Sequence, residues 1–248
     1  MSAQVDVFCD RYDRVYSLGQ WCATAILLRK CGLRAASGPF DWFKPKADRP
    51  YLLEYLRCLR ERFSVFMRQS ALRLDGFCGP EGKDRYLDVE TGWVSYHDFL
   101  HGATLADSYG AFRARLDRRI GRLLGDLDSG RRILFVHFLG KGHYERREVA
   151  AAMQEFRAAF PAAHADLLVM ESDSRDAEVR YENPAKGISF AVGDFYDASR
   201  HDVVMGNECL CCRVLSRIGV RGRWRNLIRL RVASWGRKLR RQGRRHEG

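Results

Sequence analysis

The residue best placed for chemistry is Cys22, which ends the segment Ser17-Leu18-Gly19-Gln20-Trp21-Cys22. A short strand before Gly19 and a helix after it would put this cysteine in the first turn of the helix. The positive end of the helix dipole and unpaired backbone N–H groups favour the thiolate there, which is the form that attacks a carbonyl carbon. The same N–H groups could hold a developing oxyanion. A packing role for Cys22 is the alternative.

Other residues with useful chemistry follow predicted strands. His137 lies near the carboxyl end of the strand Arg132–Phe138, where parallel α/β sheets bind their ligands, so it is a candidate base. A structural histidine with one satisfied nitrogen is the alternative. Glu171 and Asp173 follow another predicted strand. Acids at strand ends bind a metal or a sugar nucleotide, but more often they cap the next turn.

The eight cysteines are irregularly spaced, and the N-terminus has neither the basic start nor the apolar stretch of a signal peptide. We therefore expect reduced thiols in a cytoplasmic protein. The cluster Cys209-Leu210-Cys211-Cys212 lacks the second ligand pair that zinc sites usually have. The sequence thus predicts no metal and no cofactor.

Alternating strands and helices are expected to position these residues. The predicted strands are Val15–Gly19, Gly92–Tyr96, Arg132–Phe138, Asp166–Met170, Ile188–Val192 and Val203–Asn207, and the predicted helices are Cys22–Lys30, Tyr51–Met67, Phe112–Leu127 and Val149–Phe160. This alternation predicts a single α/β domain over residues 1–220, in which a mainly parallel sheet is flanked by helices. Residues 221–248 are predicted to form a C-terminal basic amphipathic helix.

The net charge of +12 is concentrated near the C-terminus. From Arg213 onward there are 13 Lys or Arg residues and one acid, whereas residues 1–212 have equal numbers of basic and acidic residues. A nucleic-acid footprint would normally lie on the folded domain, so we expect no specific nucleic-acid partner. In the stretch from Arg223 to Arg245, Trp224 and Trp235 join other apolar residues at helical spacing among arginines. This pattern is typical of a helix that lies on an anionic membrane surface, here at the inner face of the membrane.

Two further motifs follow the Cys22 turn. Pro39-Phe40-Asp41-Trp42 forms a P-F-D-W box, and His97-Asp98-Phe99 forms an H-D-F element. An Arg-rich helix and a strand of L-F-V type, Leu134-Phe135-Val136, come after them. Together with the S-L-G segment before Cys22, these motifs resemble a bacterial family of unknown function whose members are predicted to be papain-like cysteine peptidases. The resemblance covers roughly residues 12–140.

This resemblance implies that Cys22 is the nucleophile and that His97 is its base. Asp41 is the expected group to orient the imidazole, because the P-F-D-W box would return near the Cys22 turn. The expected oxyanion-binding residues of the turn are Gln20, Gly19 and Ser17. The sequence departs from true papains, in which the glutamine lies further upstream of the cysteine and the strand–helix alternation is not found.

The first functional hypothesis is therefore a thiol hydrolase that acts on a peptide, amide, ester or glycan-linked substrate through Cys22 and His97. The alternative is a glycan-related enzyme, a glycosyltransferase or accessory factor of bacterial surface polysaccharide biosynthesis. The α/β layout, the aromatic loop at residues 40–42 and the basic tail indicate this alternative. A third hypothesis is a membrane-recruited binding module without enzymatic activity.

Overall fold

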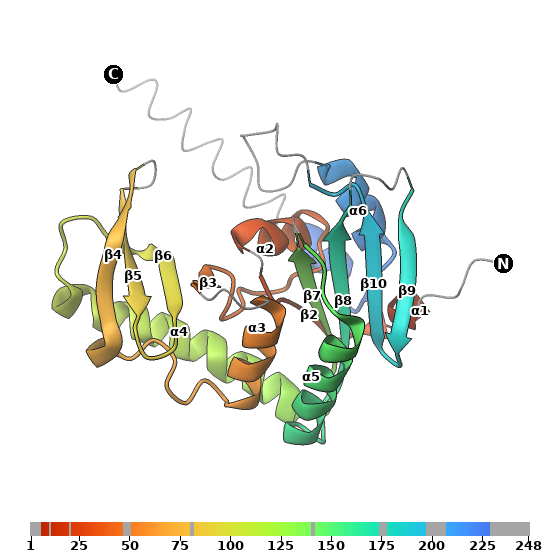
Figure 1. Ribbon diagram of the computed structural model, residues 1–248, viewed down its shortest axis with the longest axis horizontal. Coiled ribbons are helices and arrows are strands. Elements are labelled where there is room, and N and C mark those ends of the chain that lie inside the picture. Colours follow the sequence, from red (N-terminus) through yellow and green to blue (C-terminus); the bar gives the residue numbers. More distant parts are fainter. Residues whose placement is uncertain are drawn as a thin grey trace.

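A five-stranded and a four-stranded β-sheet lie side by side in the molecule, and the long helix α4 (Leu105–Asp128) runs along both (Figure 1). The computed structural model describes residues 6–9, 11–19, 21–46, 51–79, 82–139, 142–173, 178–196 and 207–228. Near its start, α4 packs Phe112 on Phe99 of the smaller sheet, with ring centroids 4.8 Å apart. Near its end, Asp126 accepts a 2.6 Å hydrogen bond from Tyr16 of the larger sheet. The helix therefore connects the two sheets.

The larger sheet contains four parallel strands and one antiparallel edge strand. Its order is β2 (Arg14–Ser17), β7 (Arg132–Leu139), β8 (His164–Ser172), β10 (Ile188–Gly193) and β9 (Arg180–Ala185). The first four strands are parallel, and β9 pairs antiparallel with β10. Every residue of β7 after the first is buried, as expected for a strand that is covered on both faces.

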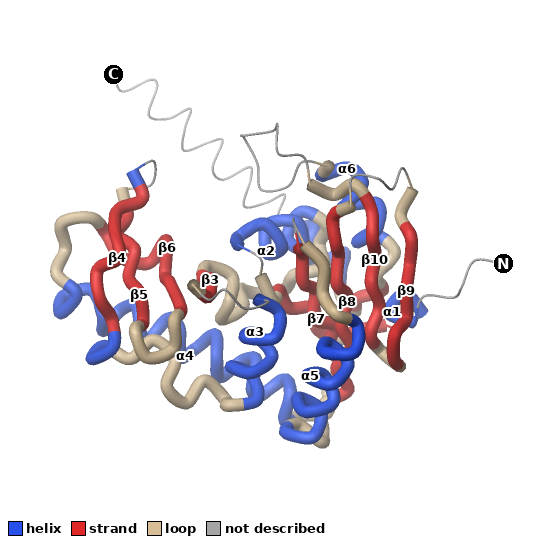
Figure 2. The backbone as a smooth tube through the Cα atoms, viewed as in Figure 1, coloured by secondary structure: helices blue, strands red, loops and turns tan. Residues whose placement is uncertain are grey.

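Helices cover both faces of this sheet (Figure 2). On one face, α3 (Tyr51–Arg60), α4 and α5 (Arg146–Ala159) share an apolar core with strand residues such as Phe135. On the other face, α2 (Trp21–Lys30) and α6 (Glu208–Ser216) share a core with residues such as Leu134 and Val136. This division follows from the alternation of side chains along a strand. The short elements α1 (Asp6–Cys9), β1 (Arg11–Tyr12) and β11 (Gly219–Val220) complete the described chain on this side.

The smaller sheet is antiparallel throughout, and of its strands only β6 corresponds to a predicted strand, Gly92–Tyr96. Its order is β3 (Phe43–Pro45), β6 (Trp93–Leu100), β5 (Lys83–Asp88) and β4 (Leu72–Cys78), with a 3-10 turn at Gln69–Ala71 before β4. The predicted α/β class is confirmed, but the sheets are mixed, so one mainly parallel sheet does not describe the molecule. Most of β4 and β9 is exposed or half-buried. These strands therefore lack the apolar alternation on which strand prediction depends.

The second predicted helix is too long. It was expected to reach Met67, but α3 ends at Arg60, and Arg62, Phe63 and Met67 then have positive φ angles between 52° and 58°. Phe63 and Met67 are nevertheless buried in the same core as α3. Their apolar side chains continued the helical pattern although the backbone had left the helix.

Part of the C-terminal prediction lies outside the described residues. This applies to most of the strand at 203–207 and to the tail beyond residue 228. Residues 223–228 are helical, with Trp224 and Ile228 exposed, and Asn226 donates a 3.1 Å hydrogen bond to the carbonyl of Gly32 at the end of α2. Among the described helices, none combines the length and the apolar character needed to cross a membrane.

Candidate functional site

The turn between β2 and α2 is fixed by hydrogen bonds on several sides. Gly19 has a φ of +74°, and a Cβ atom at this position would overlap the buried Tyr55 hydroxyl, so glycine is required. Its N–H donates to Ser17 Oγ at 3.2 Å. Its carbonyl accepts from the backbone N–H of Phe138 at 3.3 Å and from the Thr24 hydroxyl. The turn therefore leads into α2 with a defined backbone path.

Cys22 lies in the first turn of α2, as the sequence predicted. Its side chain is half-exposed, whereas the next three residues of the helix are buried. The first N–H groups of any α-helix lack partners within the helix, and they carry the positive end of its dipole. The thiol is thus placed where an anionic sulfur and a developing oxyanion are both stabilised.

Tyr55 connects the Cys22 turn with the P-F-D-W box. This fully buried side chain lies against Gly19 and donates a 3.0 Å hydrogen bond to the carbonyl of Phe43. Its ring also meets the Phe40 ring edge-to-face, at 4.9 Å between centroids. One buried residue therefore lies between the turn and the box.

The H-D-F element lies in a bulge of β6. The pairs that flank the bulge are Asp84–Phe99 and Tyr86–Ser95. Between these pairs β5 has one residue and β6 has three, of which His97 is the middle one. Bulges bend a strand and re-aim its side chains, and they are frequent beside active sites.

The pairing of β3 with β6 brings the box beside this bulge. Phe43 is registered opposite Ser95, and the preceding residue, Trp42, contacts His97 directly. The two ring centroids are 5.2 Å apart in an edge-to-face arrangement. A series of contacts therefore runs from the Cys22 turn through Tyr55 and the box to His97.

Asp41 is buried, and its strongest contacts are local. Its Oδ2 atom forms an ion pair with Arg34 and accepts a 2.8 Å hydrogen bond from the N–H of Gly38. Within the described residues its Oδ1 atom has no hydrogen-bond partner. Burial raises the pKa of Asp41 to about 6, while the Arg34 charge opposes the increase. The contact with His97 comes from Trp42, so the orienting role of Asp41 stays a prediction.

Three more residues of the turn were predicted to bind the oxyanion: Gln20, Gly19 and Ser17. Gln20 lies outside the described residues. Ser17 and Gly19 bond to each other and hold the turn. Their direct part in oxyanion binding stays a prediction.

His137 supports the Cys22 turn from β7 and has no nitrogen left for a base. It is fully buried, its Nδ1 lies 2.7 Å from the carbonyl oxygen of Leu18, and its Nε2 lies 2.8 Å from the Tyr144 hydroxyl. The carbonyl oxygen of Leu18 can only accept, so Nδ1–H donates to it. The unprotonated Nε2 then accepts from the Tyr144 hydroxyl, which itself accepts from the N–H of Leu52. Burial lowers the pKa of His137 to about 4. The structural role is therefore the better interpretation of His137.

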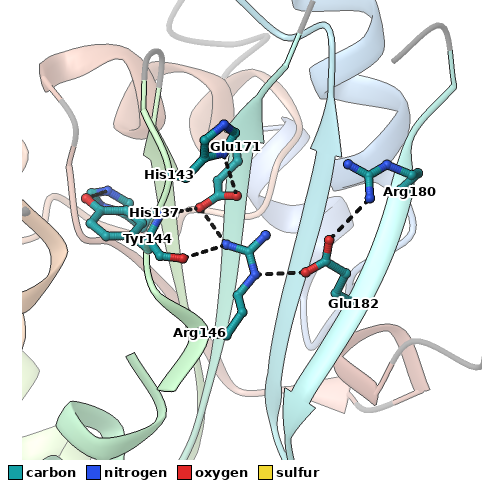
Figure 3. A network of polar contacts seen from close by, with 7 residues as sticks. All are labelled: His137, His143, Tyr144, Arg146, Glu171, Arg180 and Glu182. Carbon is teal, nitrogen blue, oxygen red and sulfur yellow. Dashed lines mark hydrogen bonds and ion pairs between the residues drawn. The ribbon is translucent and has the colours of Figure 1, made fainter. Parts of the chain in front are cut away.

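A polar network continues from Tyr144 along the carboxyl ends of β7 and β8 (Figure 3). Glu171 is fully buried, and its Oε1 atom accepts from the N–H of Tyr144 at 2.9 Å and from Arg146 at 2.8 Å. Arg146 also donates to Glu182 at 2.8 Å. The sequence singled out Glu171 as a strand-end acid, but no pattern indicated Tyr144 or Arg146. In the part of the chain that the structure describes, no three His, Cys, Asp or Glu residues form a group suited to a metal ion.

Fold and site together define an α/β protein that presents a half-exposed cysteine at the strand-to-helix turn after the first strand of its larger sheet. Residues 13–168 match the model of the family described as "Putative papain-like cysteine peptidase (DUF1796)", and the chain belongs to this family. The matched region contains Cys22, Asp41 and His97. The family resemblance predicted from the sequence is thereby confirmed. Separate searches of curated proteins and of solved structures found no match.

Proposed function

We propose that the protein is a cysteine hydrolase of the peptidase type, with Cys22 as the nucleophile and His97 as its base. The observation that carries this proposal is the position of Cys22, half-exposed in the first turn of α2, in a chain of a papain-like peptidase family. The Trp42 contact, which ties His97 to the box beside the same turn, supports the pairing.

In this mechanism the Cys22 sulfur attacks the carbonyl carbon of an amide or ester, and the backbone N–H groups of the α2 first turn stabilise the oxyanion. The His97 imidazolium gives its proton to the leaving amine or alcohol, which departs as the acyl–sulfur bond remains. A water molecule then gives a proton to His97 and attacks the thioester, which releases the acid and restores the thiol. No cofactor takes part in these steps.

Selective thiol labelling tests the proposal. An ordinary cysteine is only about 0.3% thiolate at pH 6, so a sulfur held as thiolate by an imidazolium should react with iodoacetamide at least about tenfold faster. Burial raises the pKa of Cys31 to about 12 and also raises the pKa of Cys58 and Cys211, so these thiols should react slowly. Among the cysteines whose side chains the structure describes, the relevant competitors are the more exposed Cys78, Cys209 and Cys212.

The matched control is a histidine of the same sheet. His97→Ala should remove the advantage of Cys22, whereas His101→Ala should preserve it, because the exposed His101 is paired with Asp84 at 2.7 Å. Rates for each cysteine come from mass spectrometry of the digested protein. If Cys22 reacts no faster than Cys209, or if His97→Ala leaves its rate unchanged, the hydrolase proposal is wrong.

The glycan-related alternative predicts a different experimental result. It requires binding of a nucleotide sugar that Cys22→Ala leaves intact, and no contact between described residues favours it specifically. The attachment of the basic tail to an anionic membrane is likewise a proposal. Trp224 and Ile228, at the start of that tail, are 61% and 51% exposed, which suits insertion into a membrane interface.

A further inference from the structure

A surface pocket lies at the far end of the helix that carries Cys22. Its volume is about 240 Å³. The residues that line it come from α2, from the loop that leads into the P-F-D-W box, and from the C-terminal segment. They are Arg29, Arg34, Ala35, Ala36, Ser37, Trp42 and Asn226.

Positive charge around this pocket is only partly compensated. The guanidinium group of Arg34 is paired with Asp41, but those of Arg29 and Arg119 form no hydrogen bond or ion pair with any residue that the structure describes. Burial lowers the pKa of Arg34, and the nearby positive charges of Arg29 and Arg119 contribute to the decrease. These three guanidinium groups therefore lie close enough to repel one another, and only Arg34 among them is paired with a carboxylate of the described residues. Their mutual repulsion would be relieved by an anion.

The pocket is in line with the candidate nucleophile. Cys22 and Ile26 are half-buried and Arg29 is exposed, while the intervening residues of α2 are buried, so these three positions form one open strip along the helix. Seven residues separate Cys22 from Arg29, which corresponds to about 10 Å along the helix axis. An extended peptide covers that distance with about three residues.

The same pocket also approaches the candidate base. Trp42 lines the pocket, and its ring contacts the His97 ring at 5.2 Å between centroids. The guanidinium forks of arginine suit the planar carboxylate and the phosphate group, and an indole provides a flat apolar wall. The wall formed by Asn226 is held by its hydrogen bond to Gly32.

We propose that this pocket is a substrate subsite that binds an anionic group, a carboxylate or a phosphate, about three residues from the bond that Cys22 attacks. The inference rests on the proposed hydrolase function for its place in the reaction, although anion binding itself does not require catalysis. The preferred substrate is then an acidic peptide that lies along α2, with its acidic group held by Arg29 and Arg119.

Calorimetric titration of the Cys22→Ala protein at low ionic strength tests this inference without any need for turnover. Three probes distinguish the sources of the anion. They are inorganic phosphate, a pentapeptide with blocked ends and a single Glu, and the matching Gln peptide with a free carboxyl terminus. We expect at least one of them to bind.

The decisive comparison uses two double variants with the same change in net charge. Arg29→Gln/Arg119→Gln should weaken binding by about tenfold or more, because each guanidinium loses a charge-assisted hydrogen bond to the anion. Arg118→Gln/Arg147→Gln removes two exposed arginines on α4 and α5 and should change binding by less than about twofold, since neither lines the pocket and exposed charges are screened by salt.

Two results would overturn the inference: no binding of any probe, or an equal loss of binding in both double variants. Either result leaves the thiol-labelling test of Cys22 and His97 untouched. Conversely, a failed labelling test together with a selective loss in Arg29→Gln/Arg119→Gln would identify an anion-binding pocket in a protein that is not a thiol hydrolase. If the double variant fails to fold, the single variant Arg29→Gln decides: weakened binding supports the inference, and full binding overturns it.

Discussion

The buried His137 should give the protein a measurable loss of stability in acid. The perturbation is His137→Gln, which keeps one hydrogen-bond donor and one acceptor for Leu18 and Tyr144 but removes the titrating group. Burial lowers the pKa of His137 from its ordinary value of 6.5 to about 4. Between these two pH values the unfolded chain binds a proton at this residue and the folded chain does not.

The size of the effect follows from the linkage between proton binding and folding. A tenfold change in proton affinity corresponds to about 1.4 kcal/mol, so the decrease from 6.5 to about 4 corresponds to about 3 kcal/mol. The neutral His137 contributes this stability above pH 6.5. The contribution should fall as the pH drops below 6.5 and be lost once the pH has passed through about 4.

The assay is urea unfolding followed by tryptophan fluorescence, from pH 7.5 to pH 4, for the wild-type chain and for His137→Gln. The quantity compared is the free energy of unfolding of the wild-type chain minus that of the variant. Any loss of packing in the variant changes this difference equally at every pH, and Asp41 titrates in both chains, so neither effect alters how the difference varies with pH. That difference should shrink by about 3 kcal/mol between pH 7.5 and pH 4, with the same urea slope in both chains. A difference that stays constant over this range would refute the assignment of His137 as a buried neutral histidine.

Two further predictions concern the turn and the tail. Gly19→Ala should destabilise the fold by about 3 kcal/mol in urea unfolding, because alanine is strained at positive φ and its Cβ would meet the buried Tyr55, whereas an unchanged midpoint would mean that the turn relaxes freely. Trp224→Ser should reduce flotation with anionic vesicles and leave the weak flotation with neutral vesicles unchanged. Equal flotation of the wild-type chain with both kinds of vesicle would exclude an electrostatic membrane contact.

The four parallel strands of the larger sheet were readily predictable because they are mostly buried, whereas the exposed edge strand β9 was missed. The run from Ile133 to Phe138 is apolar except for His137, and β7 fills this stretch with only one further residue at each end. The helix after the Cys22 turn was equally clear, since Gly19 ends one pattern and Gly32 ends the next. Local sequence specified these elements because burial and backbone preference agreed.

The smaller sheet and the polar network could not be read from the sequence for different reasons. β4 exposes Leu74 and Phe77, at 63% and 50%, so apolar residues there do not report an interior face. Tyr144 reaches His137 and Leu52 across three elements, and such partners have no fixed spacing in the chain. The sequence did indicate the start of β6 and Glu171 through strand patterns, whereas it indicated His97 through the family pattern rather than through its own surroundings.

The connection between β2 and β7 has a consequence for how the molecule is made. These strands are hydrogen-bonded neighbours, yet the entire smaller sheet and α4 intervene between them in the chain. During synthesis Cys22 and His97 both emerge before β7 exists. The backbone N–H of Phe138 that bonds Gly19 and the imidazole that bonds Leu18 arrive only with β7. The turn before Cys22 is therefore completed by a late, long-range pairing, so a nascent or partly unfolded chain would carry Cys22 and His97 without that backbone support.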